Sequence, residues 1–129
     1  MGEGSTKSGA GRSQGSKVSV YILRGIGVFY ILVAITLVAD ILKFGVRPET
    51  FHKVLHVCLG IVYVIASYKA SAGSIRALLT FNTVFFGIVA LTGWFFRDLG
   101  GLDAFNTTDT ILHTIVATVS LVGVLKMKR

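Results

Sequence analysis

Four long apolar runs alternate with short polar stretches along the 129 residues of this chain. They cover about residues 18–42, 51–68, 75–96 and 107–125. A helix of about 20 apolar residues crosses the ~30 Å hydrocarbon layer of a bilayer. The mean hydropathy of +0.74 agrees, because a soluble domain of this size could not hide so much apolar surface. The pattern therefore predicts an all-α polytopic membrane protein with four transmembrane helices.

The second and fourth runs follow one design, in which a polar start leads to a Leu-His pair and an apolar remainder. A shift of 57 residues places Thr50, Leu55, His56 and Val62 on the identical residues Thr107, Leu112, His113 and Val119. Upstream, a shift of 56 residues matches Leu23, Val28, Phe29, Val33, Ala34 and Thr36 with Leu79, Val84, Phe85, Val89, Ala90 and Thr92. The sequence therefore predicts two copies of one helical hairpin.

Residues 1–17 differ in composition from the rest of the chain. They are rich in Gly and Ser and carry three cations, which predicts a flexible cytoplasmic tail before a transmembrane domain at 18–129. The single cysteine, Cys58, excludes an internal disulfide. Its place in the middle of an apolar run is typical of a small buried hydrophobe.

The formal charge of +7 could indicate a nucleic-acid partner, but the basic residues flank the apolar runs, as in membrane topology. One side of the predicted bundle holds Lys7, Arg12, Lys17, Lys69, Arg76, Lys126, Lys128 and Arg129. The positive-inside rule then predicts a multi-pass protein of the inner or plasma membrane with both termini in the cytoplasm. Hairpins that start on the same side form a parallel repeat, so His56 and His113 should share one depth, toward the outer face.

Three helical faces carry small or polar residues, as helix–helix contacts in lipid do. They are His52, His56, Gly60, Tyr63 and Ser67 on the second run; Asp109, His113, Ala117 and Ser120 on the fourth; and Thr83, Gly87 and Ala90 on the third. Residues three, four, seven and eleven apart share a helical face. We therefore expect both imidazoles of the Leu-His pairs to point into the bundle.

Three hypotheses account for this histidine pair. In the structural one, each imidazole hydrogen-bonds a neighbouring helix and fixes the packing. In the second, His56 and His113 are the axial ligands of a haem b, and Arg47, Lys53 or Arg97 binds its propionates. In the third, the pair handles protons or a substrate, with Asp109 orienting His113 and His52 orienting His56.

Two further polar residues lie inside apolar runs. Arg24 is about two turns into the first run, where a long cationic side chain typically anchors at the headgroup level. The alternative is a charge that faces a substrate path. Asn82 in the third run indicates an interhelical hydrogen bond or a pocket group. A transporter or channel would place Asn82, Arg24 or Asp40 in a wet cavity.

Sequence motifs of common enzymes are absent. The chain has no HExxH, no CxxC pair and no GxSxG. It therefore gives no sign of enzymatic activity, and it indicates no catalytic residue and no metal site.

Two segments carry a family resemblance: residues 51–56 (FHKVLH) with Gly60, and residues 106–113 (NTTDTILH). They resemble an uncharacterised, mostly bacterial family of small four-helix membrane proteins, the domain of unknown function 4383, over roughly residues 20–125. Its members have an Asn/Asp-rich start and a Leu-His on helices two and four. This chain departs at Ala117, where the family has Gly, and at Glu49-Thr50, where it has Asn. The resemblance implies the fold and no activity.

The function expected from the sequence is that of a small structural or accessory membrane protein without a cofactor. Its partners would be the lipid bilayer and either further copies of itself or a larger membrane complex. The alternatives are a haem b electron-transfer subunit and a small transporter or channel.

Overall fold

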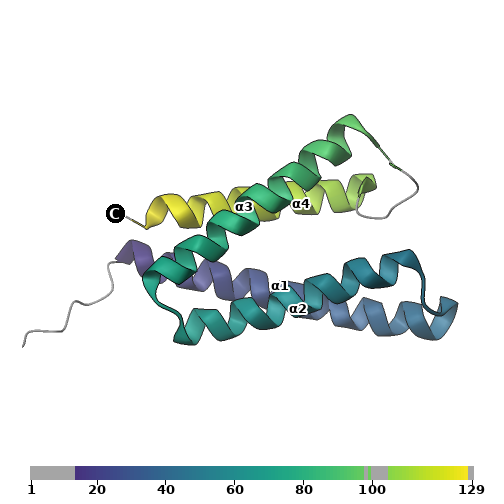
Figure 1. The fold of residues 1–129 in the computed structure, drawn as a ribbon, viewed down its shortest axis with the longest axis horizontal. Coiled ribbons are helices and arrows are strands. Elements are labelled where there is room, and N and C mark those ends of the chain that lie inside the picture. Colours follow the sequence, from purple (N-terminus) through teal and green to yellow (C-terminus); the bar gives the residue numbers. More distant parts are fainter. Residues whose placement is uncertain (1–13, 98, 100–104, 128–129) are drawn as a thin grey trace, which may run out of the picture.

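The computed structural model describes residues 14–97, 99 and 105–127, and these form four α helices (Figure 1). The helices are α1 (Gln14–Phe44), α2 (Pro48–Lys69), α3 (Ala72–Phe95) and α4 (Thr107–Lys126). Each is long and apolar enough to cross a membrane. The predicted all-α fold with four spans is therefore confirmed.

Local sequence explains the two ends of the first connection. α1 ends at Phe44 and is followed by Gly45, whose φ of 74° is a conformation that a residue without Cβ adopts easily. The Gly45 N–H donates to the Ile41 carbonyl at 2.9 Å. α2 starts with Pro48 in its first turn, where the missing N–H costs nothing. α1 itself begins at Gln14, where the sequence placed the start at Val18, and residues 1–13 of the predicted tail lie outside the described ones.

Side chains cap the two later helices. Ser71 Oγ accepts a hydrogen bond from the Ser74 N–H at 3.2 Å at the start of α3. Asn106 Oδ1 accepts from the Asp109 N–H at 2.7 Å and so caps the start of α4. The Asp109 carboxylate thus lies in the first helical turn, near the positive end of the helix dipole.

The helices pack as two hairpins, α1 with α2 and α3 with α4. In the first hairpin the backbones touch at two glycines. A Cβ added to Gly60 would lie 2.6 Å from the Gly27 carbonyl oxygen, and one added to Gly27 would lie 2.9 Å from the Gly60 oxygen. In the second hairpin, Gly93 makes room for the side chain of Thr110. Such close approach at small residues is typical of helices that associate in lipid.

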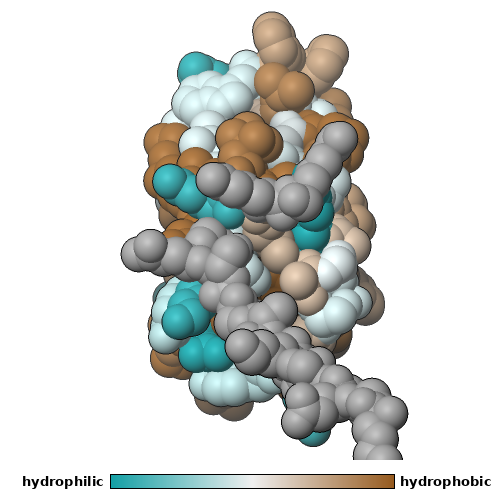
Figure 2. Space-filling model, turned by 90° about the vertical axis from the view of Figure 1, so that its left-hand side faces the viewer, coloured by the Kyte–Doolittle hydropathy of each residue, from teal (hydrophilic) through white to brown (hydrophobic). Residues whose placement is uncertain are grey.

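The two hairpins contact each other chiefly through α1 and α4. Near the start of α1, the Ser19 hydroxyl donates to the Gly123 carbonyl at 2.6 Å. Figure 1 shows α3 diverging from the first hairpin toward the end that holds the α3–α4 connection. The opposite end holds the start of α1, the end of α4 and the α2–α3 turn. Figure 2 looks onto this end and shows hydrophilic residues on it, with hydrophobic residues around the sides.

A polar network in the middle of the bundle joins all four helices. Asn82 Oδ1 on α3 accepts hydrogen bonds from the hydroxyls of Tyr30 on α1 (3.2 Å) and Tyr63 on α2 (2.9 Å). Asn82 Nδ2 donates to Ser120 Oγ on α4 at 2.7 Å, and Ser120 donates in turn to the Val116 carbonyl. Asn82 is fully buried. The expectation that it forms an interhelical hydrogen bond is confirmed.

Two expectations about helix faces are wrong. The buried face of α3 includes Asn82, Phe86, Ala90 and Gly93, so Ala90 is buried as expected, whereas Thr83 and Gly87 are only half-buried and the face is rotated by about one residue. Cys58 is exposed on α2 and not buried. His56 and His113 are buried as expected, as are Gly60, Tyr63, Ser67 and Ser120, whereas His52, Asp109 and Ala117 are half-buried.

Candidate functional site: a three-histidine cluster

All three histidines of the chain gather at one place between the hairpins. His52 and His56 come from α2 and His113 from α4, and one ring nitrogen of each lies within 4.8 Å of the others. The rings of His56 and His113 are 5.8 Å apart, centroid to centroid. The repeat therefore placed this pair correctly at one depth. We call His52, His56 and His113 the histidine cluster.

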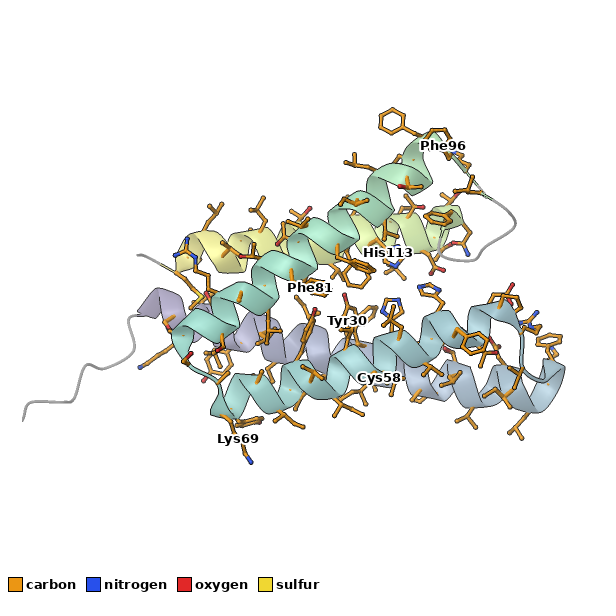
Figure 3. All side chains as sticks on the ribbon, in the orientation of Figure 1. Tyr30, Cys58, Lys69, Phe81, Phe96 and His113 are labelled. Carbon is orange, nitrogen blue, oxygen red and sulfur yellow. The ribbon has the colours of Figure 1, made fainter. Side chains whose placement is uncertain are left out.

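Two buried aromatic rings support the cluster from the other two helices. Tyr30 on α1 lies 4.8 Å from the His56 ring, and Phe86 on α3 lies 5.3 Å from the His113 ring. Tyr30 and Phe86 are themselves 5.5 Å apart. They are equivalent under the repeat shift of 56 residues. Each hairpin thus contributes one aromatic ring and one imidazole to a group of four rings in contact. Figure 3 labels two of them, Tyr30 and His113, which lie between the hairpins.

The hydrogen bonding of His56 differs from expectation. Its Nε2 lies 2.8 Å from Nε2 of His52, one turn earlier on the same helix, and no neighbouring helix provides a partner for it among the described residues. Its Nδ1 is buried and has no hydrogen-bond partner in the described part of the chain. Only 7% of His56 is exposed. His56 therefore contacts the other helices through its ring faces and not through a hydrogen bond among the described residues.

A cavity of about 380 Å³ opens beside the cluster. Its walls are apolar side chains of α1 and α4, among them Phe29, Val33 and Leu112. The polar part includes the histidine cluster with Lys53 and Asp109. We call this cavity the histidine pocket. Its size falls within the range of small-molecule and cofactor sites, and its lining shows their usual mixture of apolar walls and a few polar groups.

Lys53 connects the pocket to α1. Its ammonium group forms an ion pair with the Asp40 carboxylate, 13 positions earlier in the chain. Both side chains are partly buried, which reduces the screening of the pair by solvent. The pair compensates the charge of Lys53, so Asp109 is the remaining carboxylate on the pocket wall. The local electrostatics therefore favour a cation over an anion beside the imidazoles.

The other polar candidates lie away from this pocket. Arg24 donates from Nε to Ser67 Oγ at 3.1 Å, and its guanidinium lies 3.9 Å from the Tyr68 ring centroid. Asn82 belongs to the central network. Neither residue lines the histidine pocket, and Asp40 is connected to it only through Lys53. The side chains named for a transporter path therefore do not meet in this cavity, and headgroup anchoring by Arg24 stays a prediction.

The haem hypothesis can be compared with the geometry of the cluster. Two axial imidazole nitrogens would stand about 4 Å apart on opposite faces of a porphyrin. Here the His56 and His113 planes differ by 23°, and the Phe86 ring lies 5.5 Å from His56 and 5.3 Å from His113. A third imidazole, His52, hydrogen-bonds His56. This arrangement is closer to the ligand set of one small ion, and haem ligation stays a prediction.

Sequence reasoning missed three parts of the site. Lys53 was expected only as one of several propionate partners, and Tyr30 was not expected to be part of a site. The strongest missed signal is the spacing of His52 and His56, because histidines at i and i+4 on one helical face form the metal-binding pair of known zinc helices. The sequence alone indicated no metal site, whereas the fold adds His113 to that pair.

No family model, curated protein or solved structure matches this chain. The resemblance to the small four-helix membrane family stays a prediction. The argument for function therefore rests on the pocket.

Proposed function

We propose that this chain is a small accessory protein of the cell membrane that binds a small ligand in the histidine pocket. The observation that carries the proposal is the placement of five ionisable side chains around a cavity inside the span region. Such residues are costly in a membrane and commonly mark functional sites. Packing alone would not require them, because the Asn82 network already joins the four helices.

The shape of the pocket supports ligand binding over a purely structural role for the histidines. A structural histidine satisfies its polar atoms on a neighbouring helix, whereas Nδ1 of His56 has no such partner among the described residues. The apolar walls from α1 and α4 leave the cavity partly open between the hairpins. A ligand can therefore reach the imidazoles without unfolding the central network.

The accessibility of two neighbouring α4 positions tests the pocket. In a Cys58→Ser background, Leu112→Cys should react with a water-soluble methanethiosulfonate reagent, because Leu112 lines the pocket. Ile111→Cys is the matched control at nearly the same depth, since Ile111 is exposed outside the pocket and should face lipid. Equal reaction rates at the two sites would contradict a water-filled pocket and leave the histidines as packing residues.

We also propose that both termini face the cytoplasm and the pocket opens toward the outer side. Lys69, Arg76 and Lys126 lie at the end of the bundle that holds the start of α1, and this charge supports the orientation. In intact cells, Ser13→Cys in the Cys58→Ser background should resist an impermeant thiol reagent, and Gly100→Cys should react. The opposite labelling pattern would reverse the orientation.

A further inference from the structure

We infer that the histidine cluster binds one divalent transition-metal ion, with Zn²⁺ the simplest candidate. This inference rests on the proposed function, since it names the ligand of the same pocket. The chain has three histidines, and each has a ring nitrogen within 4.8 Å of the others between α2 and α4. A structural role for one imidazole would not gather the other two.

The distances suit an ion after small side-chain movements. Zn²⁺ binds imidazole at about 2.0–2.1 Å, so three nitrogens around a tetrahedral ion stand about 3.3 Å from one another. The His52 and His56 Nε2 atoms are 2.8 Å apart, and all ligand atoms of the cluster lie within 4.8 Å. The ion would therefore widen the closest pair by about 0.5 Å and draw the third nitrogen in by up to about 1.5 Å. Rotation of imidazole side chains covers this range.

The buried ring of His56 provides a second, independent observation. A neutral imidazole has one N–H donor and one bare acceptor nitrogen. Whichever nitrogen bears the hydrogen, Nε2 faces His52 and Nδ1 is left buried without a partner among the described residues. Leaving such a group unsatisfied costs about 1–3 kcal/mol. The chain thus keeps this polar ring at the wall of a cavity, where an ion can approach it, without satisfying both of its nitrogens in the described structure.

The chemistry of the pocket selects the class of ion. Imidazole nitrogens suit Zn²⁺, Cu²⁺, Ni²⁺ and Fe²⁺, whereas Mg²⁺ and Ca²⁺ prefer oxygen ligands. The one thiol, Cys58, is exposed on α2 and not part of the pocket lining. Three protein ligands leave a fourth position, which water or a small molecule can occupy within the cavity. Asp109 on the pocket wall adds the negative charge that a dication favours.

Metal titration of the full chain tests the inference directly. The protein is purified in detergent with a tag that contains no histidine, stripped with a chelator and titrated with Zn²⁺ against a chromophoric competitor. We expect one Zn²⁺ per chain. His52→Ala and His113→Ala should each weaken binding at least tenfold, and Cys58→Ser should leave it unchanged.

A measurement on the wild-type protein tests the inference even if the histidine variants fail to fold. Cu²⁺ bound to the wild-type chain should show, in electron paramagnetic resonance, hyperfine splitting from two or three imidazole nitrogens. Absence of saturable binding, equal binding after loss of either histidine, or loss of binding in Cys58→Ser would each overturn the inference. A Soret band in protein from haem-supplied cells, bleached by either His56→Ala or His113→Ala, would replace the metal ion by haem. A reactive Leu112→Cys with no metal bound would reject the ion and keep the pocket.

Discussion

The two hairpins share one plan and differ at the positions that meet inside the bundle. The first hairpin has Tyr30, His52 and Gly60, where the second has Phe86, Asp109 and Ala117. The first also has Ile26 at the position of Asn82. The comparison teaches that the shared residues set the depth of the site, whereas the differing ones give each hairpin a separate task. The first supplies the phenol donors and the additional imidazole of His52. The second supplies the amide of Asn82, which accepts from the phenols, and the carboxylate of Asp109.

The largest effect should come from Asn82→Ile, which gives the second hairpin the residue that the first has at this position, Ile26. Asn82→Ile removes the acceptor of the Tyr30 and Tyr63 hydroxyls and leaves both donors buried. We expect a loss of about 2–3 kcal/mol in the free energy of unfolding, measured in mixed detergent. Thr83→Val is the control, because Thr83 bonds only the Leu79 carbonyl of its own helix. Equal losses in the two variants would contradict a joining role for Asn82.

The second-largest effect should come from Gly60→Ala, at the point where α1 and α2 cross. Gly60→Ala gives α2 the residue found at Ala117, but its Cβ would lie 2.6 Å from the Gly27 carbonyl oxygen. We expect a loss of about 1–3 kcal/mol from forced separation of α1 and α2, by the same unfolding assay. Gly87→Ala meets nothing within 4 Å and should be neutral or slightly stabilising. A neutral Gly60→Ala would show that α1 and α2 have room to separate.

The histidine pocket offers a substitution that makes the hairpins more alike. Asp109→His repeats, one turn before His113, the spacing of His52 and His56. If the cluster binds Zn²⁺, a fourth imidazole should tighten binding about tenfold in the competitor titration. Asp109→Asn keeps the size without the imidazole or the charge, and should bind more weakly than wild type. A histidine variant that binds no better than the asparagine variant would place position 109 out of reach of the ion.

The smallest expected effect comes from a single hydroxyl. Tyr30→Phe copies Phe86 and removes one of the two donors to Asn82. Since Tyr63 still donates to the same oxygen, we expect a loss of only about 0.5–1.5 kcal/mol in the unfolding assay. Tyr21→Phe is the control on the exposed face of α1. A loss as large as that of Asn82→Ile would mean that the Tyr30 hydroxyl holds the network alone.

The sequence predicted the spans and the depth of the histidines because both are local properties. Apolar length defines a span, and the repeated Leu-His pair aligns His56 with His113. The rotation of α3 was not predictable in this way. Small residues suggested the Thr83–Gly87 face, but Phe86 is buried because imidazole rings of two other helices stack on it. A partner on another helix decides such a position.

The set of residues that line the pocket also could not be predicted from the sequence, because it depends on tertiary contacts. The spacing of His52 and His56 is visible in the sequence, but the direction of their side chains toward His113 depends on how the hairpins meet. The Lys53–Asp40 ion pair joins α1 and α2, and no sequence motif indicates it. Sequence reasoning could therefore name the residues without assembling them into one pocket.

The unequal helix lengths have a consequence for the surrounding lipid. α1 has 31 residues and α4 has 20, which correspond to about 46 Å and about 30 Å. The bond between Ser19 and Gly123 fixes the two helices together near one end, so the surplus length of α1 extends past α4 at the other. A hydrocarbon layer of about 30 Å matches α4 and is too thin for α1. α1 would therefore tilt more than α4 or thicken the lipid beside it, so the lipid shell would differ between the two sides of the protein.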